Sequence, residues 1–504
     1  MKYLQGQHIL ILGLGSSGLA MTRWCAQMGA DITVADTRES PANLQVLKSE
    51  LPEVQFKSGP FAANLIEGTS VRAVFASPGL APIETAPVIK AAQGMGLWVG
   101  GELSLFVQAL ENLKATRDYA PQVLAITGTN GKTTVTALTG QLIERAGKTV
   151  KVAGNIGPTL LDSLRLSMTT ALPEVWVLEL SSFQLDNAGP FEPSAATVLN
   201  ITQDHLDWHG NMAAYAAAKE KIFGASSLMV LNRDDARVMA MLPEPVRAKL
   251  QKPVVRAHVT YGAEMPQRPG DFGLETVNGM TWLVRALEAD ETRRLRKGEV
   301  EEIHIQRLMP ADALRIRGRH NAVNALAALA LATSTGASLA SMLFGLREYK
   351  GEPHRVEPVA IVNEVEYFDD SKGTNVGATV AALLGLGAER RVVVILGGEG
   401  KGQDFSPLAE PVARYARAVV LIGRDAPLIR DEIKACGVPL IEASTLPEAV
   451  NAAKDIAQAG DAVLLSPACA SFDMFRDYPH RAQVFCQAVA EIAEAAGQVM
   501  EASL

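Results

Sequence analysis

A glycine-rich loop followed by a lysine and two threonines is the stretch of this sequence best suited to chemistry. Residues 125–138 read AITGTNGKTTVTAL: an apolar run, a turn through Gly128 and Gly131, and a helical pattern from Lys132 onward. Free backbone N–H groups and the positive end of a helix dipole would converge there on a phosphate. Lys132 would neutralise the terminal phosphates, and the Thr133 hydroxyl would meet a Mg²⁺ ion.

The spacing of this loop departs from the usual phosphate-loop pattern. In G-x-x-x-x-G-K-[ST] the first glycine would fall on Ile126, so we interpret the loop as a shortened variant, TGTNGKTT. An ordinary glycine turn with a helix-capping threonine is the alternative interpretation.

A second glycine pattern lies near the N-terminus. Residues 8–37 predict strand, glycine turn, helix and strand, with Gly13, Gly15 and Gly18 in G-x-G-x-x-G and Asp36 ending the second strand. This is a Rossmann-like nucleotide fingerprint, with an acid where a ribose hydroxyl would bind. The pattern by itself also fits an NAD-dependent dehydrogenase, or a tight turn without a ligand.

Acidic and imidazole side chains follow two further apolar strands. Glu179 stands at the end of VWVLEL (175–180), where a buried carboxylate is costly unless it meets a cation or a donor. It is therefore predicted to bind a metal or to act in catalysis, with a solvated strand end as the alternative. The strand in 195–210 leads into a loop that carries four more such groups: Asp204, His205, Asp207 and His209. Their clustering favours one of the histidines as a ligand.

Two candidates have an ordinary structural explanation when only the residues are considered. Lys219 lies on an alanine-rich helix (212–224), where a solvated lysine is expected. Asn324 lies near the start of the helix at 317–332, where polar residues are often only caps.

The last third of the chain again alternates strands with helices, and its strands end in small polar turns. These turns carry hydroxyls, lysines and one acid: Asp370, Ser371, Lys372, Thr374, Lys401 and Ser471. Lysines and hydroxyls at the C-terminal edge of a parallel sheet form a site for a small anion such as a carboxylate. A set of ordinary loop residues is the alternative.

These elements predict an α/β protein of three domains. A Rossmann-like N-terminal domain would span 1–117, a central P-loop ATPase-like domain with a parallel sheet 118–351, and a Rossmann-like C-terminal domain 352–504. The polar segment 111–122 marks the first boundary. Residues 264–311, with the charged run 291–302, are interpreted as exposed hairpin or loop structure whose arginines are solvated.

Composition narrows the class of protein. The chain has 504 residues, 48% of them hydrophobic, and a formal net charge of -8, which disfavours a nucleic-acid partner. The four cysteines lie far apart, as expected of reduced thiols. Residues 321–346 carry no charge, but the polar TSTGAS divides them into two helices too short for a bilayer. We expect a cytoplasmic, monomeric protein without a membrane partner.

Three functions compete at this point. A ligase driven by ATP would use all three predicted domains, one for a nucleotide or nucleotide-sugar, one for ATP with Mg²⁺ and one for a small anion. A dehydrogenase would need only the first domain. A nucleotide-binding module without catalysis is the third, and the predicted metal-binding residues argue against it.

Eight motifs in chain order resemble the Mur ligases, and most closely the branch that adds D-glutamate: GTNGKTT, ELSSFQLD, NITQDHLD, GRHNAVNALAA, PHR, DDSKGTNVGAT, LGGEGKGQDF and LSPACASFDMF. The resemblance covers the whole chain. It implies that ATP phosphorylates the carboxylate of UDP-N-acetylmuramoyl-L-alanine, that the amine of D-glutamate attacks the acyl phosphate, and that a tetrahedral intermediate collapses to amide and phosphate in peptidoglycan precursor synthesis.

The resemblance also implies a role for particular residues. Those for ATP are Gly128, Thr129, Asn130, Gly131, Lys132, Thr133, Thr134, Asn324, His354 and Arg355. Thr133 and Glu179 would bind one Mg²⁺ and His205 a second, supported by a carbamylated Lys219. Those for the UDP substrate are Ser16, Ser17, Asp36, Thr37, Arg38, Asn155 and Gln184. Those for D-glutamate are Lys372, Thr374, Lys401, Ser471, Phe472 and Tyr478.

Overall fold

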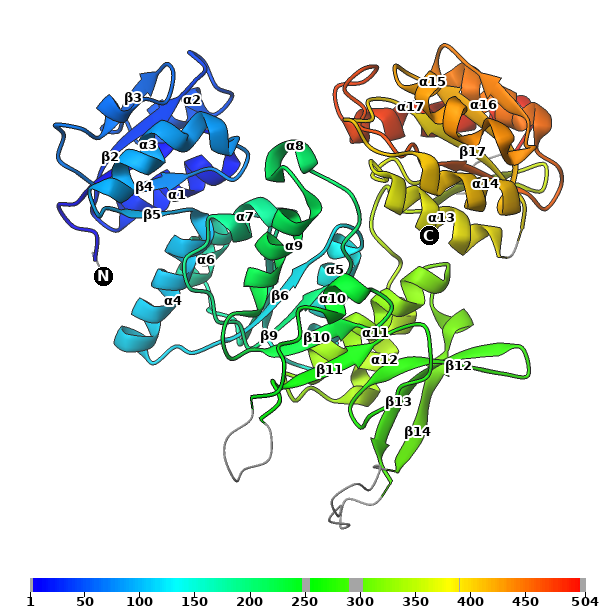
Figure 1. The fold of residues 1–504 in the computed structure, drawn as a ribbon, viewed down its shortest axis with the longest axis horizontal. Coiled ribbons are helices and arrows are strands. Elements are labelled where there is room, and N and C mark those ends of the chain that lie inside the picture. The colour runs from blue at the N-terminus through cyan, green and yellow to red at the C-terminus, as the bar shows by residue number, and fades with distance from the viewer. Residues whose placement is uncertain (1–2, 247–253, 290–301, 389, 499–504) are drawn as a thin grey trace.

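The computed structural model describes the chain except for residues 1–2, 247–253, 290–301, 389 and 499–504, and it forms three lobes in chain order (Figure 1). Each lobe is built around its own largely parallel sheet. The predicted α/β organisation is therefore confirmed.

The first lobe holds a five-stranded parallel sheet in the order β3-β2-β1-β4-β5. Its elements are β1 (His8–Leu12), α1 (Ser16–Gln27), β2 (Asp31–Asp36), α2 (Leu44–Glu50), β3 (Gln55–Ser58), β4 (Val71–Ala76), α3 (Pro82–Gly94) and β5 (Trp98–Gly100). The turn between β1 and α1 requires its glycines: Gly13 has φ +84°, and a Cβ on Gly18 would lie 1.9 Å from the carbonyl oxygen of Gly13. The glycine pattern thus lets α1 pack closely on the sheet.

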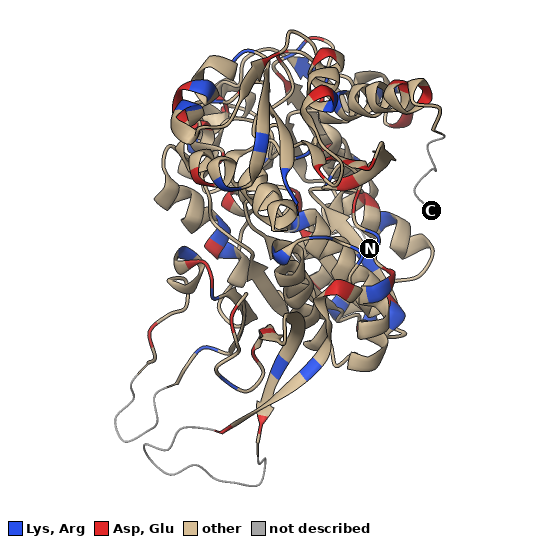
Figure 2. Ribbon diagram, turned by 90° about the vertical axis from the view of Figure 1, so that its right-hand side faces the viewer, with Lys and Arg blue, Asp and Glu red and all other residues tan. Residues whose placement is uncertain are grey.

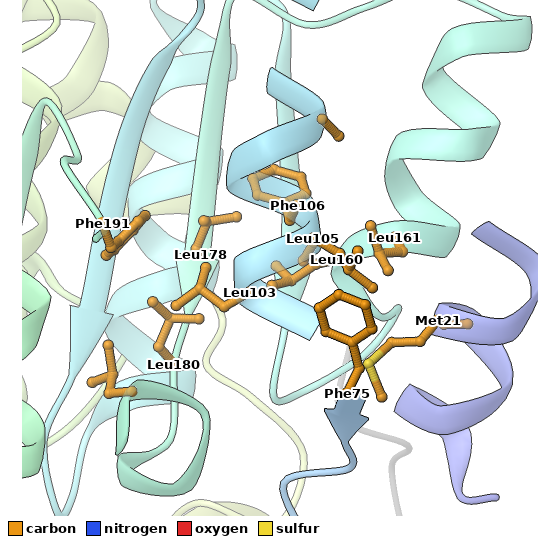
Figure 3. Packing of buried hydrophobic residues seen from close by; sticks show 14 of the residues in the cluster. Met21, Phe75, Leu103, Leu105, Phe106, Leu160, Leu161, Leu178, Leu180 and Phe191 are labelled. Carbon is orange, nitrogen blue, oxygen red and sulfur yellow. The ribbon is translucent and has the colours of Figure 1, made fainter. Parts of the chain in front are cut away.

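The polar segment predicted as a boundary is mostly helix, because α4 (Glu102–Arg117) runs through it. The apolar side of α4 packs against the second lobe, with the rings of Phe106 and Trp176 centred 5.2 Å apart. Figure 3 shows Leu103 and Phe106 between Phe75 of the first lobe and the strand that carries Leu178. One apolar cluster thus joins the first two lobes.

The second lobe holds a six-stranded parallel sheet in the order β11-β10-β9-β6-β8-β7. Its strands are β6 (Gln122–Thr127), β7 (Val150–Gly154), β8 (Val175–Glu179), β9 (Ala195–Val198), β10 (Leu228–Asn232) and β11 (His258–Tyr261). Its helices are α5 (Lys132–Arg145), α6 (Leu160–Thr169), α7 (Ser182–Asp186), α8 (Leu206–His209), α9 (Met212–Glu220), α10 (Ala236–Met239), α11 (Arg319–Thr333) and α12 (Leu339–Glu348). The central strands β6 and β8 are buried along almost their whole length, as expected of strands covered on both faces.

The segment predicted as exposed hairpin or loop is a three-stranded antiparallel sheet: β12 (Phe272–Val277), β13 (Met280–Glu288) and β14 (Ile303–Pro310). The hairpin is confirmed, but full exposure is wrong, because Phe272, Leu283 and Met309 are buried in the core that contains α11. Nearly all of the charged run 291–302 lies outside the described residues.

The third lobe holds a six-stranded sheet in the order β15-β16-β20-β17-β18-β19, parallel except for the antiparallel pair β15 and β16. Its strands are β15 (Glu357–Val362), β16 (Val365–Asp369), β17 (Val392–Gly397), β18 (Ala416–Ile422), β19 (Leu440–Glu442) and β20 (Ala462–Leu465). Its helices are α13 (Val376–Gly387), α14 (Ala409–Tyr415), α15 (Ala426–Ile433), α16 (Leu446–Ile456) and α17 (Tyr478–Ala495).

The positions of the charged residues and the lengths of the helices bear on the class of protein. Figure 2 shows basic and acidic positions interspersed along the described ribbon, as seen from this side. The uncharged stretch 321–346 is divided between α11 and α12, as predicted. Among the described residues, no helix is at once long and apolar enough to cross a membrane.

Candidate active site

The glycine-rich loop at 128–131 connects β6 to α5, as predicted. Gly128 has φ +151°, and a Cβ there would lie 2.9 Å from the Cβ of Leu199; Gly131 has φ +83°. The loop is braced by the segment that follows β9, because the side-chain oxygen of Asn200 accepts a hydrogen bond from the backbone N–H of Asn130 at 2.8 Å. This bracing holds the loop at the N-terminus of α5, where phosphate binding is expected.

Lys132, the first residue of α5, folds back over the loop. Its Nζ donates hydrogen bonds to the carbonyl oxygens of Gly128 at 2.9 Å and Thr129 at 2.8 Å. Burial lowers the pKa of this lysine, and the nearby Glu179 carboxylate opposes that effect. The ammonium of Lys132 is therefore held against the glycine-rich loop, at the N-terminus of α5.

Glu179 ends β8 and is 1% exposed. Its Oε1 accepts a hydrogen bond from Nδ2 of Asn155 at 2.9 Å, whereas its Oε2 is buried without a hydrogen-bond partner among the described residues. A buried carboxylate oxygen without a donor is costly unless a cation completes it. Glu179 could thus hold a divalent metal, as the sequence predicts.

Thr133 lies where the second and third lobes meet. It is 5% exposed, and its Oγ1 accepts hydrogen bonds from Nη2 of Arg355 at 3.3 Å and from Nζ of Lys372 at 3.5 Å. Burial lowers the pKa of Lys372, and the neighbouring Arg355 acts in the same direction. Two cations from beyond residue 351 therefore reach the predicted phosphate loop.

Lys219 is buried, which corrects the expectation of a solvated lysine. It is 1% exposed, and its Nζ donates to Oγ1 of Thr127 at 3.2 Å and to the carbonyl oxygen of Gly128 at 2.9 Å. The ammonium also lies 4.7 Å from the centre of the Tyr215 ring, and it has no carboxylate in ion-pair contact among the described residues. Burial, and to a lesser extent the charge of Lys132, lower its pKa well below the usual value for lysine.

The loop after β9 separates its two histidines. His205 caps α8 with φ +53°, and its Nε2 lies 3.6 Å from Oδ2 of Asp204. Burial lowers the pKa of His205, and Asp204 opposes this effect. His209 instead shares a hydrogen bond of 2.9 Å with Ser182, and burial lowers its pKa to about 4. A neutral imidazole can ligate a metal through its free nitrogen.

A cleft of about 100 Å³ opens beside the phosphate loop, between the second and third lobes. The residues that line it come from the loop, α11, the interlobe connection and α13: Asn130, Gly131, Thr134, Asn200, Ile316, His320, Asn321, Asn324, Gly351, Glu352, Arg355, Val356, Asp370, Ala378, Ala381 and Ala382. Asn324 and Arg355, both predicted to contact ATP, therefore share a cleft with the loop. His354 faces elsewhere, since its Nδ1 lies 2.6 Å from Oδ2 of Asp369.

The predicted D-glutamate residues form two groups at the C-terminal edge of the third sheet. Nζ of Lys372 lies 5.6 Å from the centre of the Tyr478 ring, and Nζ of Lys401 lies 6.0 Å from that of Phe472, which is 65% exposed. Ser471 is buried beside Phe472. Thr374 follows Lys372 in the same turn and donates its backbone N–H to the carbonyl oxygen of Lys372 at 3.0 Å.

Arg481 of α17 connects the turns that carry these residues, and the sequence reading missed it. Its buried guanidinium donates to Oγ and O of Ser371 at 3.0 and 2.7 Å and to the carbonyl oxygen of Cys469 at 3.1 Å. Burial lowers its pKa to about 10. Asp370 was noticed in the turn but not assigned to a site; it lines the cleft, and burial raises its pKa to about 7.

The residues predicted for the UDP substrate lie apart from the phosphate loop. Ser16 and Ser17 begin α1. Asp36 is 1% exposed and accepts hydrogen bonds from the backbone of Leu14 at 2.8 Å and from the Arg38 guanidinium, which lowers its pKa to about 2.

The other residues predicted to bind the UDP substrate do not lie together. Thr37 is exposed beside Asp36, and Asn155 points its amide at Glu179. Gln184 is largely engaged in the second lobe, because its Oε1 accepts from both the backbone and the hydroxyl of Ser181.

Comparisons with known proteins agree along the chain. Three family profiles match: the MurD-like N-terminal domain of Mur ligases over residues 7–101, the Mur ligase middle domain over 126–332, and the glutamate ligase domain of Mur ligases over 354–469. The chain is 70% identical to a UDP-N-acetylmuramoylalanine–D-glutamate ligase of Albidiferax ferrireducens, over 99% of both chains. It is 57% identical to the protein of that name from Cupriavidus pinatubonensis, over 98% of this chain and 99% of the other.

Solved structures support the same fold at low sequence identity. The chain is similar to MurF from Acinetobacter baumannii, with a TM-score of 0.56 and 16% identity over 98% of this chain and 92% of that one. It is also similar to MurF ligase from Thermotoga maritima, solved in complex with ADP, with a TM-score of 0.56 and 15% identity over 98% and 96%.

Proposed function

Because the chain belongs to the Mur ligase family, we propose that it joins D-glutamate to UDP-N-acetylmuramoyl-L-alanine at the expense of ATP, in peptidoglycan precursor synthesis. It is an ATP-dependent ligase. The observation that carries the proposal is the meeting at Thr133: Lys372, from the turn of the predicted amino-acid site, donates to a hydroxyl of the phosphate loop. An amino acid held by that turn would therefore lie next to the terminal phosphate.

The reaction needs an activated carboxylate, because a free carboxylate is a poor electrophile. A carboxylate oxygen of the UDP substrate attacks the γ-phosphorus of ATP, and ADP leaves. The amine of D-glutamate then attacks the acyl carbon, loses a proton, and expels phosphate from the tetrahedral intermediate. Lys132, Arg355 and Lys372 surround Thr133 and would neutralise the charge that gathers in both steps.

The acyl phosphate must be kept from water. The cleft beside the phosphate loop is closed on one side by α13 of the third lobe, through Ala378, Ala381 and Ala382. We propose that the lobes close further when ATP and the amino acid bind, which would exclude water. Equal small-angle scattering profiles with and without both ligands would count against closure.

A divalent metal could bind Oε2 of Glu179, which is buried and has no hydrogen-bond partner among the described residues. We propose that Glu179 and Thr133 hold one Mg²⁺ and that His205 takes part in holding a second. When bound, such ions neutralise phosphate oxygens and favour phosphoryl transfer.

Lys219 is proposed to be carbamylated. Its amine is buried beside the phosphate loop and has no carboxylate partner among the described residues, so a cation there is poorly compensated. Carbamylation forms a bond from the amine nitrogen to the carbon of CO₂ and releases a proton. The product is a carboxylate, which would help to hold the metal.

Substrate positions follow from the same resemblance. We propose that Ser16, Ser17 and the turn at 36–38 hold the UDP part, with Asn155 and Gln184 nearer the muramoyl group. Lys401, Ser471 and the other residues of the third lobe's edge would surround D-glutamate. We also propose that the domain boundaries lie at residues 117 and 351 and that the protein is a cytoplasmic monomer.

The decisive experiment measures phosphate release from ATP and Mg²⁺ with UDP-N-acetylmuramoyl-L-alanine, adding D-glutamate, L-glutamate, L-alanine, L-lysine or diaminopimelate in turn. Release only with D-glutamate supports both the reaction and the amino-acid site. Release with a different amino acid would keep the mechanism but refute the assignment of the third lobe. Release with none would refute the ligase function.

A further inference from the structure

Asn375 joins three loops that the reaction uses. It is 5% exposed and precedes α13 in the third lobe, directly after the turn of Lys372 and Thr374. Its Nδ2 donates to Oδ1 of Asn130 at 3.0 Å, and its Oδ1 accepts from Nδ2 of Asn130 at 3.2 Å. The two amides thus form a reciprocal pair between the third lobe and the phosphate loop.

The same amide reaches the loop after β9. Nδ2 of Asn375 lies 3.4 Å from Oδ2 of Asp204, the oxygen that stands 3.6 Å from Nε2 of His205. Asn130, the partner in the phosphate loop, is held at its backbone by Asn200. The Asn375 side chain therefore contacts both the phosphate loop and the loop after β9 that carries His205, and it directly follows the turn of Lys372 and Thr374.

Both ends of α13 pack closely against the second lobe. A Cβ on Gly377 would lie 2.8 Å from Oγ1 of Thr202 and 3.1 Å from Nδ2 of Asn130, and one on Gly385 would lie 2.8 Å from Cε1 of His320. Small residues between them face the nucleotide cleft. The close approach of Gly377 to Asn130 places the first turn of α13, and with it Asn375, directly against the phosphate loop.

We propose that Asn375 is a positioning residue that couples the seating of the third lobe to the phosphate loop and to the His205 loop. This inference rests on the proposed function. When the amino-acid turn is in place, Asn375 orders Asn130 and Asp204 together. Acyl transfer to the amine and phosphoryl transfer from ATP then depend on the same amide pair.

Asn375 also caps α13, since its Oδ1 accepts from the backbone N–H of Ala378 at 2.9 Å. The two roles can be separated. Serine and aspartate are good N-caps, but neither can donate to Asn130 as the amide does, and aspartate places a second carboxylate against Asp204. Asn375→Ser keeps the cap and loses the amide pair. Asn375→Asp keeps the cap and an oxygen that can accept from Asn130, but it loses the amide donor and places a carboxylate against Asp204.

The matched control is Asn211→Ser. Asn211 caps α9 through a hydrogen bond of 2.9 Å from the backbone N–H of Ala214, at an exposed position. We expect Asn211→Ser to leave kcat unchanged, and Asn375→Ser to lower it about 10-fold or more because several hydrogen bonds are lost. Asn375→Asp should be slower still. The KM for the UDP substrate should stay constant, because that site lies on another lobe.

A double-mutant cycle tests the coupling in the phosphate-release assay. Asn130→Ala and Asn375→Ser together should lose less activity than the product of the two single losses, since each change breaks the same pair. Thermal unfolding should show that Asn375→Ser and Asn211→Ser are both folded at the assay temperature, with the larger shift for Asn375→Ser because its lost hydrogen bonds are buried. The inference is overturned if Asn375→Ser and Asn375→Asp turn over like wild type, or if the two losses multiply. If the wild-type chain itself releases no phosphate, it is the proposed function that fails.

Discussion

Replacement of Lys219 by alanine gives the sharpest test of the active site. In the structure this amine is 1% exposed, lies beside the phosphate loop and has no carboxylate partner among the described residues. If it is carbamylated, Lys219→Ala removes an anion that supports the metal site. Loss of one preorganised electrostatic group costs roughly 10²- to 10³-fold in kcat, and we expect a loss of at least that size.

The burial of Lys219 also makes the modification chemically favourable. Only a neutral amine attacks CO₂, and a lysine with its ordinary pKa is neutral in about one molecule in a thousand at pH 7.5. Burial lowers the pKa of Lys219 well below that value, and each unit of lowering raises the neutral fraction about tenfold. The neutral amine should therefore be far more abundant here than at a surface lysine.

The assay is phosphate release by Lys219→Ala with and without added formate, acetate or propionate. The removed side chain leaves room for a short carboxylate, so one of these acids should restore part of the activity. Lys221→Ala is the matched control, because Lys221 is 47% exposed and pairs with Asp186 at 2.8 Å. Full activity of untreated Lys219→Ala would refute the reasoning, and so would equal rescue of both variants.

Three further outcomes are expected. Gly18→Ala should lower the free energy of unfolding in urea by about 1–3 kcal/mol, because the added Cβ would lie 1.9 Å from the carbonyl oxygen of Gly13. Gly94→Ala is the control, because no atom lies within 4 Å of a Cβ there. Equal effects of the two substitutions would contradict the packing argument. Burial raises the pKa of Glu102 to about 7, so the wild-type stability should fall as pH rises from about 4.5 to 7. That part of the pH dependence should disappear in Glu102→Gln, which pH-dependent unfolding can check. Arg481→Met should raise the KM for D-glutamate more than that for ATP in steady-state kinetics; a uniform rise would indicate only general misfolding.

Local patterns predicted the elements that bind nucleotides. The phosphate loop and the first glycine turn were recognisable because their function depends on backbone shape, and backbone shape depends on glycines at short, regular spacing. Glu179 was predicted because a charge at the end of an apolar strand is costly wherever that strand is buried. These arguments need only neighbours in sequence.

Other parts of the site depend on contacts between distant residues. Lys219 appears solvated on its own helix, and only the packing of α9 under the phosphate loop buries it. The antiparallel strands of 272–310 appeared exposed because the core face that covers them belongs to α11. Arg481 and Asn375 carry no local signal, since an arginine in a helix and an asparagine before one are ordinary residues.

Periodicity, glycine spacing and strand-end chemistry are local properties, so they predict the three α/β lobes, the phosphate loop and the polar residues at the strand ends without any knowledge of the packing. The contacts between these segments follow from how the lobes pack. Packing buries one oxygen of Glu179 without a hydrogen-bond partner among the described residues, and it brings Lys372 to Thr133 and Asn375 to Asn130. Each meeting joins segments that lie far apart in the chain, and their distance is set by how the lobes pack.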